Sequence, residues 1–479
     1  MKYLSVAEKL TLEAVCRRFQ SLVYSVLGQQ SVIDFTGSCV WGSAHSNLSK
    51  YRSKSPVQLT QGLKFCTYKM LIMNANHLTT LRLEEYRCIF DVNVFAAIGQ
   101  LAVNLEDLCL LFSSKRNHYT SMKTIFSRCS KLRIFGLEGF FNTSGSNELL
   151  RDLRQCKYLE VLRLGMITHL DFALLRKLKA PLRELSIRNV TTLSNFRSND
   201  GFPGFAGFPF NSTLTTFRLF IFLHSLHPEL GDWLQDWLPS MACKCPALTQ
   251  LQLDCHGFAE PPNFKTFNNL KVLHCMINGR DEIEVLLRSA LPDVEDLYID
   301  FYPGEVHDLT VDFSLAPTSV KSLTLPSVAL DDDSYKNLLR MPKLQRVFVK
   351  NEKFSLAQLK QLVAHVQLVE IGAAMVFVDL ATAQELTELR RKALAEGRYR
   401  FPSLYLDHDE PLVLHVNYTH HAAFANPLIK IKDHKLDKYI YERVGSCRLD
   451  NEWLFYGHDF LQNMHELLRD SQILYGHLR

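Results

Sequence analysis

Residues 129–137 read CSKLRIFGL, residues 156–164 read CKYLEVLRL and residues 245–253 read CPALTQLQL. Each stretch contains one phrase, apolar-x-x-apolar-x-apolar, in which x is any residue. Side chains two residues apart lie on the same face of an extended chain, so the second and third apolar side chains share one face of a strand. Each stretch therefore predicts a short strand that is buried on one face.

The phrase recurs eleven times between residues 78 and 349, and successive first positions are 22 to 34 residues apart. Such regular succession indicates an internal repeat. Apolar residues between the phrases recur at helical intervals, and Ser355 and the run 331–334 are suited to cap the last two helices. The phrases begin at Leu78, Leu105, Leu132, Leu159, Leu182, Leu214, Leu248, Leu270, Val294, Val320 and Leu344. The helical patterns are Phe95/Ile98/Leu101, Met122/Ile125/Phe126, Phe172/Leu175/Leu178, Tyr335/Leu338/Leu339 and Leu356/Leu359/Leu362/Val363.

Over roughly residues 56–375 the chain resembles the leucine-rich-repeat family, whose period is about 20–29 residues. Cys129, Cys156 and Cys245 each precede a phrase as Cys-x-x-Leu, which resembles the cysteine-containing repeats of intracellular proteins. The family often places Asn or Cys three residues after the third apolar position, and here Asn278 fits. The resemblance implies an α/β solenoid, or horseshoe, with parallel strands on its concave wall and helices on its convex side.

We expect three segments: an N-terminal helical segment over 1–30, the solenoid over 31–379 and an α+β C-terminal cap over 380–479. The solenoid is expected to open with a strand at 31–35. Within it, GFPGFAGFPF at 201–210 is either a surface loop or an aromatic hook for a partner, and Trp233 and Trp237 are spaced to pack a convex helix. The cap is expected to contain a helix at 381–400 that Gly397 weakens near its end, a strand at 411–419, a solvated Lys-rich face at 429–443 and a helix at 453–478.

The first thirty residues carry Tyr3-Leu4, Leu10, Leu12, the run VCRRF at 15–19 and Leu22. This arrangement resembles the second half of an F-box, so the motif is N-terminally incomplete here. Phe19 stands where the family usually has Trp, and a plain N-terminal cap is the alternative. The resemblance implies docking on a Skp-type adaptor and, through it, on a cullin scaffold. Its candidate docking residues are Leu4, Leu10, Leu12, Val15, Cys16 and Phe19.

Composition and motifs exclude several other classes. The net charge is 54 − 50 = +4, which is low for a dedicated nucleic-acid binder. No apolar run is long enough to span a membrane, and Glu8 and Lys9 interrupt the region where a signal peptide needs apolar residues. We therefore expect a cytoplasmic or nuclear protein whose twelve cysteines are mostly reduced core residues.

The motifs of nucleotide-binding loops, zincins and serine hydrolases do not occur in the sequence. Cys243-x-Cys245 has no second pair at metal-binding spacing. The histidines His415, His420 and His421 are expected to be solvated or capping residues. We therefore predict no catalytic, cofactor-binding or metal-binding residues and expect a protein that is not an enzyme. The alternative is a hydrolase or metalloenzyme site in the last hundred residues.

The residues between the apolar positions of each phrase should face the concave wall, which is the usual binding surface of a solenoid. Basic residues lie toward the first half of this wall and acidic residues toward the second, which would steer a partner of complementary charge. The leading hypothesis is the substrate receptor of an SCF-type ubiquitin ligase, acting as a monomer within that complex. The alternative is a leucine-rich-repeat scaffold without a ubiquitin link. The candidate target-binding residues are Arg82, Arg163, Arg218, Gln252, His274, Tyr298, Phe348, Asp254 and Asp300.

Overall fold

The architecture is α/β, as expected, with one large all-parallel sheet of 15 strands. The strands follow one another in chain order, except that β11 and β13 form a small parallel sheet of their own. No helix in the described part of the chain is long and apolar enough to cross a membrane. The computed structural model describes residues 31–34, 71–84, 92–111, 122–141, 143–167, 172–175, 177–191, 211–223, 238–255, 263–277, 280–301, 308–309, 311–325, 329–349, 354–400, 411–418 and 428–433.

The described residues fall into two compact units, with β1 to β8 in unit 1 and β9 to β17 in unit 2. Unit 1 contains β1 (Val32–Asp34), β2 (Thr80–Glu84), α5 (Val92–Leu101), β3 (Asp107–Leu111), α6 (Lys123–Arg128), β4 (Ile134–Phe141), α7 (Thr143–Leu153), β5 (Val161–Ile167), α8 (Phe172–Leu175), β6 (Glu184–Thr191), β7 (Thr216–Leu223) and β8 (Gln250–Cys255). Unit 2 contains β9 (Val272–Ile277), α10 (Arg280–Val285), η5 (Leu286–Ala290), β10 (Asp296–Phe301), β11 (Asp308–Leu309), η6 (Phe313–Leu315), β12 (Ser322–Leu325), β13 (Ala329–Leu330), α11 (Asp332–Leu338), β14 (Arg346–Val349), α12 (Leu356–Ala364), β15 (Glu370–Val378), α13 (Leu380–Arg400), β16 (Leu412–Tyr418) and β17 (Ile429–Asp433).

The second and third apolar residues of each of the eleven phrases lie on a strand of the large sheet, so the expected strands are confirmed, and helices alternate with them from β2 to β6. The pairing keeps the phrases in register: Leu108 of β3 is opposite Phe135 of β4, which is opposite Leu162 of β5. These side chains are fully buried. Stacked apolar rows of this kind form a continuous core that no single repeat could bury alone.

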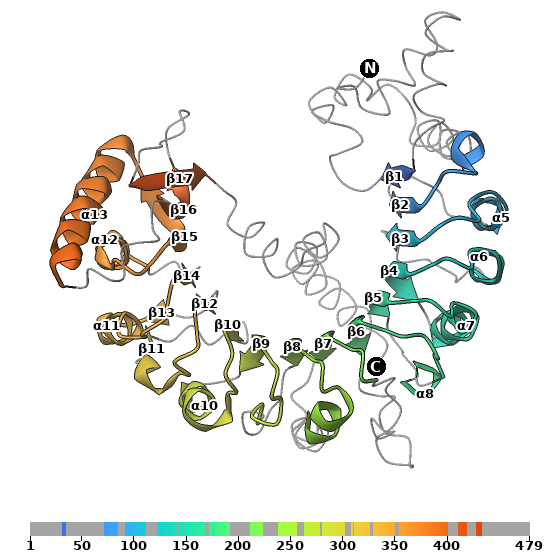
Figure 1. Cartoon of the computed structure of the whole chain (residues 1–479), viewed down its shortest axis with the longest axis horizontal. Helices are drawn as coiled ribbons and strands as arrows, with labels where there is room; N and C mark the ends of the chain where they lie inside the picture. The colour runs from blue at the N-terminus through green and yellow to red at the C-terminus, as the bar shows by residue number, and fades with distance from the viewer. Residues whose placement is uncertain are drawn as a thin grey trace, which may run out of the picture. The chain divides into compact units, whose positions relative to one another are not determined.

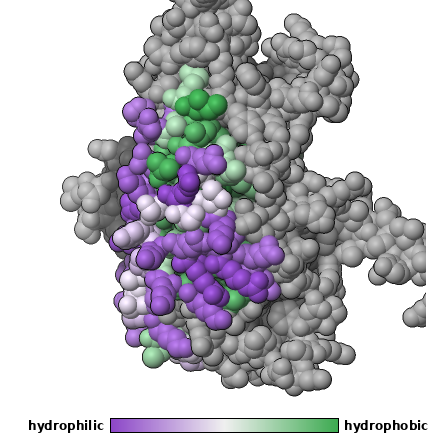
Figure 2. All heavy atoms as spheres, turned by 90° about the vertical axis from the view of Figure 1, so that its right-hand side faces the viewer, coloured by the Kyte–Doolittle hydropathy of each residue, from purple (hydrophilic) through white to green (hydrophobic). Residues whose placement is uncertain are grey.

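The helices of each unit lie on one side of its strands (Figure 1). In unit 1, Phe126 of α6 meets Phe135 of β4 edge to face, with ring centroids 5.1 Å apart. The apolar positions of the strands therefore face the helices, and the alternate positions face away from them. Figure 2 shows the helix side of unit 1, where apolar residues gather near the first repeats and hydrophilic residues cover those that follow.

A second ladder runs along the sheet edge where the strands begin. From β3 to β8, the residue before each strand continues the parallel hydrogen bonding, so that Arg133 N donates to Glu106 O and Glu160 N donates to Arg133 O. Charges alternate along this edge in unit 1, and the Arg133 guanidinium binds both Glu160 carboxylate oxygens at 3.0 and 2.9 Å. In unit 2, Glu295 accepts from Lys321 at 2.7 Å. We call Glu106, Arg133, Glu160 and Arg183 the edge ladder of unit 1.

The sheet extends further along the chain than the repeat analysis indicated. A twelfth phrase, Leu368/Ile371/Ala373, leads into β15 and was missed because alanine is a weak apolar signal at its third position. The expected strand at 411–419 is confirmed as β16. The expectation of a solvated face from residue 429 onward was wrong at its start, because β17 pairs with β16 and buries Ile429 and Ile431. The expected helix at 453–478 lies outside the described residues.

The helices follow local capping chemistry where the sequence indicated it. The Asp331 carboxylate accepts from Ser334 N at 2.8 Å at the start of α11. Ser355 and Gln358 form a reciprocal capping box at the start of α12. The expected helical pattern through Leu178 is shorter in the structure, because α8 ends at Leu175. The helix α13 runs to Arg400, past Gly397.

The close packing of α5 against α6 depends on Gly99. A Cβ atom on this residue would lie 2.9 Å from the carbonyl carbon of Thr124 and 3.0 Å from the nitrogen of Ile125. Both obstacles are backbone atoms, which no rotamer change can move. A second close approach is on the sheet, where a Cβ atom on Gly136 would lie 2.9 Å from Cys109 Sγ. This contact is to a side-chain atom, which can be removed by substitution.

We predict that Gly99→Ala lowers the free energy of unfolding by about 1–3 kcal/mol, because overpacking outweighs the gain of about 1 kcal/mol in helix propensity. Gly136→Ala should also destabilise, but Cys109→Ala should restore most of its loss by removing the sulfur atom. Urea unfolding followed by circular dichroism measures both. A Gly99→Ala protein as stable as wild type would contradict the close-packing argument.

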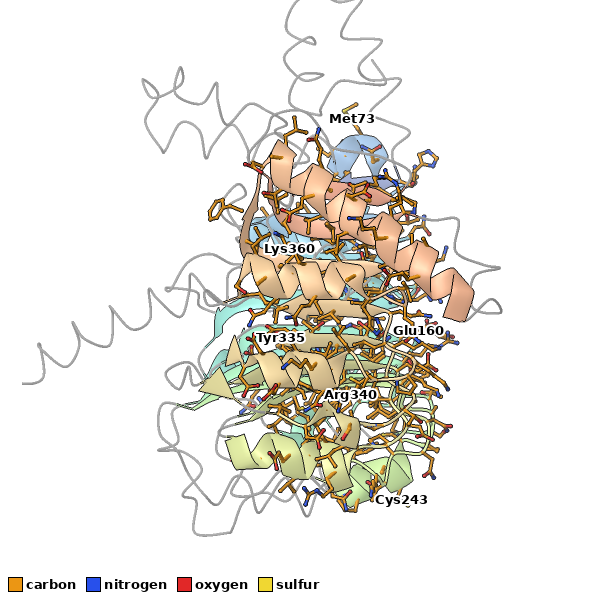
Figure 3. The ribbon with its side chains drawn as sticks, turned by 90° about the vertical axis from the view of Figure 1, so that its left-hand side faces the viewer. Met73, Glu160, Cys243, Tyr335, Arg340 and Lys360 are labelled. Carbon is orange, nitrogen blue, oxygen red and sulfur yellow. The ribbon has the colours of Figure 1, made fainter. Side chains whose placement is uncertain are left out.

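Helix α13 is fixed to the preceding repeat by the buried side chain of Arg390. Its guanidinium donates to the backbone carbonyls of Val363, His365, Val366 and Leu368 at 2.7 to 3.2 Å. Val363 is in the last turn of α12, and the other three residues lie between α12 and β15. The last carbonyls of a helix have no partner within the helix, and Arg390 supplies donors at this end. Lys360 on α12 adds a contact to Glu385 on α13 at 2.5 Å, and Figure 3 shows α11, α12 and α13 side by side with Lys360 labelled.

We predict that Arg390→Lys lowers the stability of the end of unit 2 by about 2–3 kcal/mol, because an ammonium group cannot serve four carbonyls arranged for a guanidinium. Amide hydrogen exchange should then speed up in α13 and around residues 363–368. Arg391→Lys is the matched control, because Arg391 is exposed and pairs with Glu388 one turn earlier. Equal exchange rates in both variants would refute the role given to Arg390.

Candidate functional site

The candidate site lies on the sheet face that points away from the helices, which we call the helix-distal face. In unit 1 its central row, in register from β2 to β8, consists of Arg82, Cys109, Gly136, Arg163, Ser186, Arg218 and Gln252. These are the residues that the sequence analysis assigned to the binding wall. A preceding row consists of Thr80, Asp107, Ile134, Val161, Glu184, Thr216 and Gln250.

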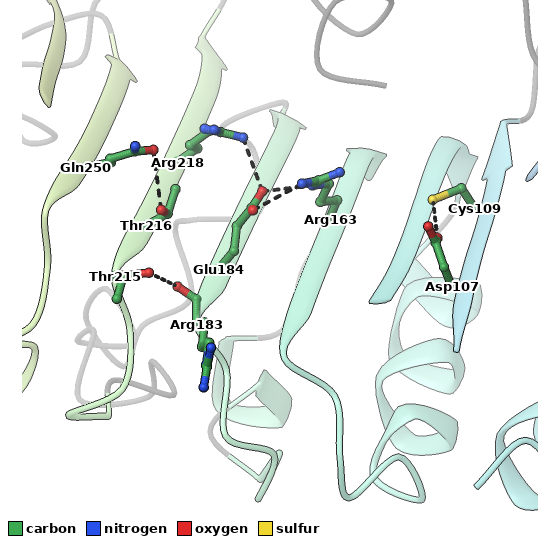
Figure 4. Close-up of polar contacts among 9 residues, drawn as sticks. All are labelled: Asp107, Cys109, Arg163, Arg183, Glu184, Thr215, Thr216, Arg218 and Gln250. Atoms are coloured by element: carbon green, nitrogen blue, oxygen red, sulfur yellow. Dashed lines mark hydrogen bonds and ion pairs between the residues drawn. The ribbon is translucent and has the colours of Figure 1, made fainter. Parts of the chain in front are cut away.

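Three charged side chains meet on this face across β5, β6 and β7 (Figure 4). Arg163 donates to both carboxylate oxygens of Glu184, from Nε at 2.8 Å and from Nη2 at 3.1 Å. Arg218 donates to Glu184 Oε1 from the other side at 3.2 Å. We call Arg163, Glu184 and Arg218 the arginine cluster.

The register explains why the arginine cluster forms. Arg163, Ser186 and Arg218 are directly opposite one another, and Glu184 is two residues before Ser186 on the middle strand. The small Ser186 side chain leaves room for both arginines to lean toward Glu184. The exposed fractions of the side chains are 6% for Arg163, 16% for Glu184 and 14% for Arg218.

Glu184 is a carboxylate at neutral pH in spite of its burial. Burial raises its pKa, but the Arg163 hydrogen bonds and the positive charges of Arg163 and Arg218 outweigh burial, and the pKa is lowered. One carboxylate thus serves two guanidinium groups. Burying charges in this way costs desolvation, which only close pairing offsets.

The Arg82 side chain forms an ion pair with a single carboxylate, that of Asp107. Arg82 Nη2 donates to Asp107 Oδ2 at 2.7 Å, and the Cys109 thiol donates to Asp107 Oδ1 at 3.4 Å. This arrangement joins β2 to β3. The expected excess of basic side chains in the first half is therefore partly neutralised, because Asp107 and Glu184 lie on the same face.

In unit 2 the helix-distal face is aromatic. His274 and Tyr298 stack with their ring centroids 4.6 Å apart, and the Tyr298 hydroxyl lies 3.5 Å from Asp300 Oδ2. Further along, the rings of Phe348 and His415 are 6.3 Å apart. Gly372 lies between these two residues in the register.

The expectation that His415 is solvated or capping was wrong. Its side chain is fully buried, and Nε2 lies 3.1 Å from Glu370 Oε1 on the neighbouring strand. The sequence analysis missed this because Glu370 and His415 are 45 residues apart in the chain. In the described part of the chain, no group of three metal-binding side chains is present.

Several predicted residues cannot be placed on either face. The F-box-like residues Leu4, Leu10, Leu12, Val15, Cys16 and Phe19 lie outside the described residues, as do 201–210, Trp233, Trp237, His420 and His421. Asp254 lies on β8, and its side chain is not described. Of the remaining target-binding candidates, Arg163, His274 and Phe348 are buried, whereas Arg82, Arg218, Gln252, Tyr298 and Asp300 are partly exposed.

The sequence analysis also missed the acidic partners of the candidate site. Asp107, Glu184 and Glu370 each stand immediately before the second apolar position of a phrase. That position lies on the helix-distal face and precedes the central row by two residues. An acidic residue there, with an arginine or histidine in the central row of a neighbouring strand, is the signal that could have found them.

The cysteines of the described residues are free thiols, and five of these six are buried. Burial raises the pKa of Cys129, Cys156 and Cys245 to about 12. A thiol of this kind is protonated at neutral pH and is a poor nucleophile. The expectation of reduced core cysteines is therefore confirmed for these positions, whereas Cys243 is exposed.

Neither a scan against protein-family models nor a search of curated proteins finds a match to this chain. Functional inference therefore depends on the helix-distal face itself.

We predict that Glu184→Gln lowers the free energy of unfolding by about 2 kcal/mol at neutral pH, because two partly buried guanidinium groups lose their counter-charge. The pKa of Glu184 is lower in the folded protein than in the unfolded chain, where a glutamate has a pKa of about 4.3. Its ionised form therefore stabilises the folded protein fully above that pH, and this contribution is lost as the pH falls through the folded pKa. The gap between wild type and variant should therefore close at acidic pH.

Urea unfolding midpoints at neutral pH and at about pH 3 measure this gap. Glu160→Gln on the edge ladder is the matched control, and its effect at neutral pH should be smaller because surface ion pairs contribute little. A gap between wild type and Glu184→Gln that stays constant down to acidic pH would contradict the ionised state assigned to Glu184.

Proposed function

We propose that the chain is a leucine-rich-repeat receptor that holds a target protein on its helix-distal face and belongs to an SCF-type ubiquitin ligase. The observation that carries the proposal is the regular succession of the phrase, with spacings in or near the family's range, on a parallel sheet whose phrases stay in register. In that family the strands line the inner wall of a curved solenoid, and this wall is the usual protein-binding surface.

The helix-distal face supports a binding role. It combines ordered charged residues, such as the arginine cluster, with partly exposed polar ones such as Gln252. Arginine and tyrosine are also the residue types that contribute most to binding energy at protein interfaces. We propose that target contacts come from the partly exposed members of this face in each unit.

The link to a ubiquitin ligase depends on the F-box-like segment at 1–30. In this proposal its apolar residues dock a Skp-type adaptor, and other subunits carry out ubiquitin transfer, so this chain supplies no catalytic residue. The free thiols of the described residues suit a cytosolic or nuclear location. Phe19 in place of the family's Trp favours the second candidate, a repeat scaffold without a ubiquitin link.

Co-elution with a Skp-type adaptor on size-exclusion chromatography tests the ligase link. We expect the full chain to form a complex, and we expect a triple variant, Val15→Asp, Cys16→Asp and Phe19→Ala, to lose it. The matched control makes equivalent changes at exposed apolar positions, Val103→Asp, Val285→Asp and Phe377→Ala, and should keep the complex. A well-folded wild-type chain that elutes alone would reject the receptor role and favour the scaffold.

A further inference from the structure

We propose that three neighbouring turns of unit 1 form a docking surface for an acidic segment of a partner protein. The turns are residues 129–133, 154–160 and 177–183, which lead into β4, β5 and β6. We call them the basic turns. The proposal goes beyond the proposed function, which places a target on the helix-distal face and gives these turns no role.

The basic turns hold a larger net positive charge than the whole chain. Every charged residue in them counts toward seven basic residues and one acidic residue, so their net charge is 7 − 1 = +6, against +4 for the chain. The flanking turns of unit 1 differ, because residues 102–106 contain one charged residue, Glu106, and residues 211–215 contain none. Arg133 and Glu160 pair with each other. The six remaining basic residues are Lys131, Arg154, Lys157, Lys177, Lys179 and Arg183.

The helix ends that lead into the basic turns do not offset this excess. The last turn of α6 contains the basic residue Arg128. In the last turn of α7, the formal charges of Arg151 and Asp152 cancel. The short helix α8 contains no charged residue. The positive charge of the basic turns is therefore carried over to the neighbouring helix ends and is not neutralised there.

The six remaining basic side chains are exposed, so a partner can reach them. Lys131 donates to the neutral side chain of Asn104 at 2.9 Å. Hydrogen bonds from Arg133 lower the pKa of Glu160, and the charges of Arg133 and Arg183 add to this effect, so the one carboxylate of the basic turns is already engaged. The other four basic side chains form no ion pair with any residue that the structure describes.

Hydrogen bonds between the basic turns make the surface continuous. Glu160 N donates to Arg133 O, and Arg183 N donates to Glu160 O, each at 2.7 Å. Neighbouring strands are about 4.8 Å apart, so three turns cover about 10 Å along the sheet edge. Arg183 points away from the arginine cluster (Figure 4), so the basic turns form a surface distinct from the helix-distal face.

The fold itself gains nothing from this concentration of charge. Like charges at neighbouring positions repel one another and destabilise the folded state. The side chains are exposed, so packing of the core does not require them. A partner with acidic residues would relieve the repulsion, which is the complementarity that steers protein association.

The extent of the surface favours a protein partner over a nucleic acid. A nucleic-acid surface needs a basic stripe that follows the phosphates, and this one stops at the flanking turns 102–106 and 211–215. The edge ladder also places Glu106 and Glu160 beside it, where a phosphate backbone would be repelled. About 10 Å corresponds to roughly three residues of an extended peptide, so a short run of Asp or Glu fits.

The test uses the full chain and fluorescein-labelled octaglutamate, with octaglutamine as the uncharged comparison. Fluorescence anisotropy should show binding of octaglutamate that weakens between about 50 and 200 mM salt, because the basic side chains are exposed. The double variant Lys157→Gln and Lys179→Gln should weaken binding by about tenfold. The matched control, Lys265→Gln and Lys343→Gln, removes the same charge from exposed turns of unit 2 and should leave binding unchanged.

Charge reversal gives a second readout in the opposite direction. The variant Lys157→Glu and Lys179→Glu should lose octaglutamate and bind octalysine more tightly than wild type does, once circular dichroism shows it folded. Equal weakening in the unit 2 control, or equal affinity of wild type for octaglutamine, would overturn the proposal. Tighter binding of an octathymidylate than of octaglutamate would also overturn it, in favour of a nucleic acid.

Discussion

The register of the parallel strands is the constraint on which the rest of the structure depends. From β3 to β8 the hydrogen-bond ladder continues into the residue before each strand, so that neighbouring phrases are aligned from that residue onward. A shift of one residue would move Phe135 and its counterparts from the helix side to the opposite face. The buried apolar rows resist such a shift, because no repeat can bury its own apolar side without its neighbours. Core packing on one face therefore fixes the positions of the side chains on the other.

The arginine cluster is a consequence of that alignment. The three residues come from three strands, and Glu184 is 21 residues from Arg163 and 34 from Arg218 in the chain, yet register brings it within hydrogen-bond distance of both. The apolar rows on the helix side hold the strands in place, and close pairing within the arginine cluster then offsets the desolvation cost of burying its charges. The same face can therefore differ in unit 2, where stacked rings replace ion pairs at equivalent positions.

How far the sequence predicts the molecule depends on the range of the interactions involved. Local signals worked: the phrases predicted the strands, and Ser355 and the acidic run at 331–334 predicted helix caps that the structure contains. Weak local signals failed, as with Ala373 on β15 and the lysine-rich β17. The sequence predicted only the basic residues of the candidate site. The phrase placed the arginines on the sheet face, but it did not indicate which acidic residues on neighbouring strands would pair with them. The Glu370–His415 pair spans an intervening helix, so no local pattern could have indicated it.

The position of the arginine cluster within unit 1 also follows from the physics of repeats. In a stacked array each strand is held by its two neighbours, so interior strands keep their register better than terminal ones. The strands β5, β6 and β7 each pair with a strand on both sides: β5 with β4 and β6, β6 with β5 and β7, and β7 with β6 and β8. Near the last described strands, by contrast, the buried Arg390 adds four hydrogen bonds to fix α13 to the preceding repeat. The arginine cluster thus lies on interior strands, whose register is held from both sides, and there the two arginines share Glu184.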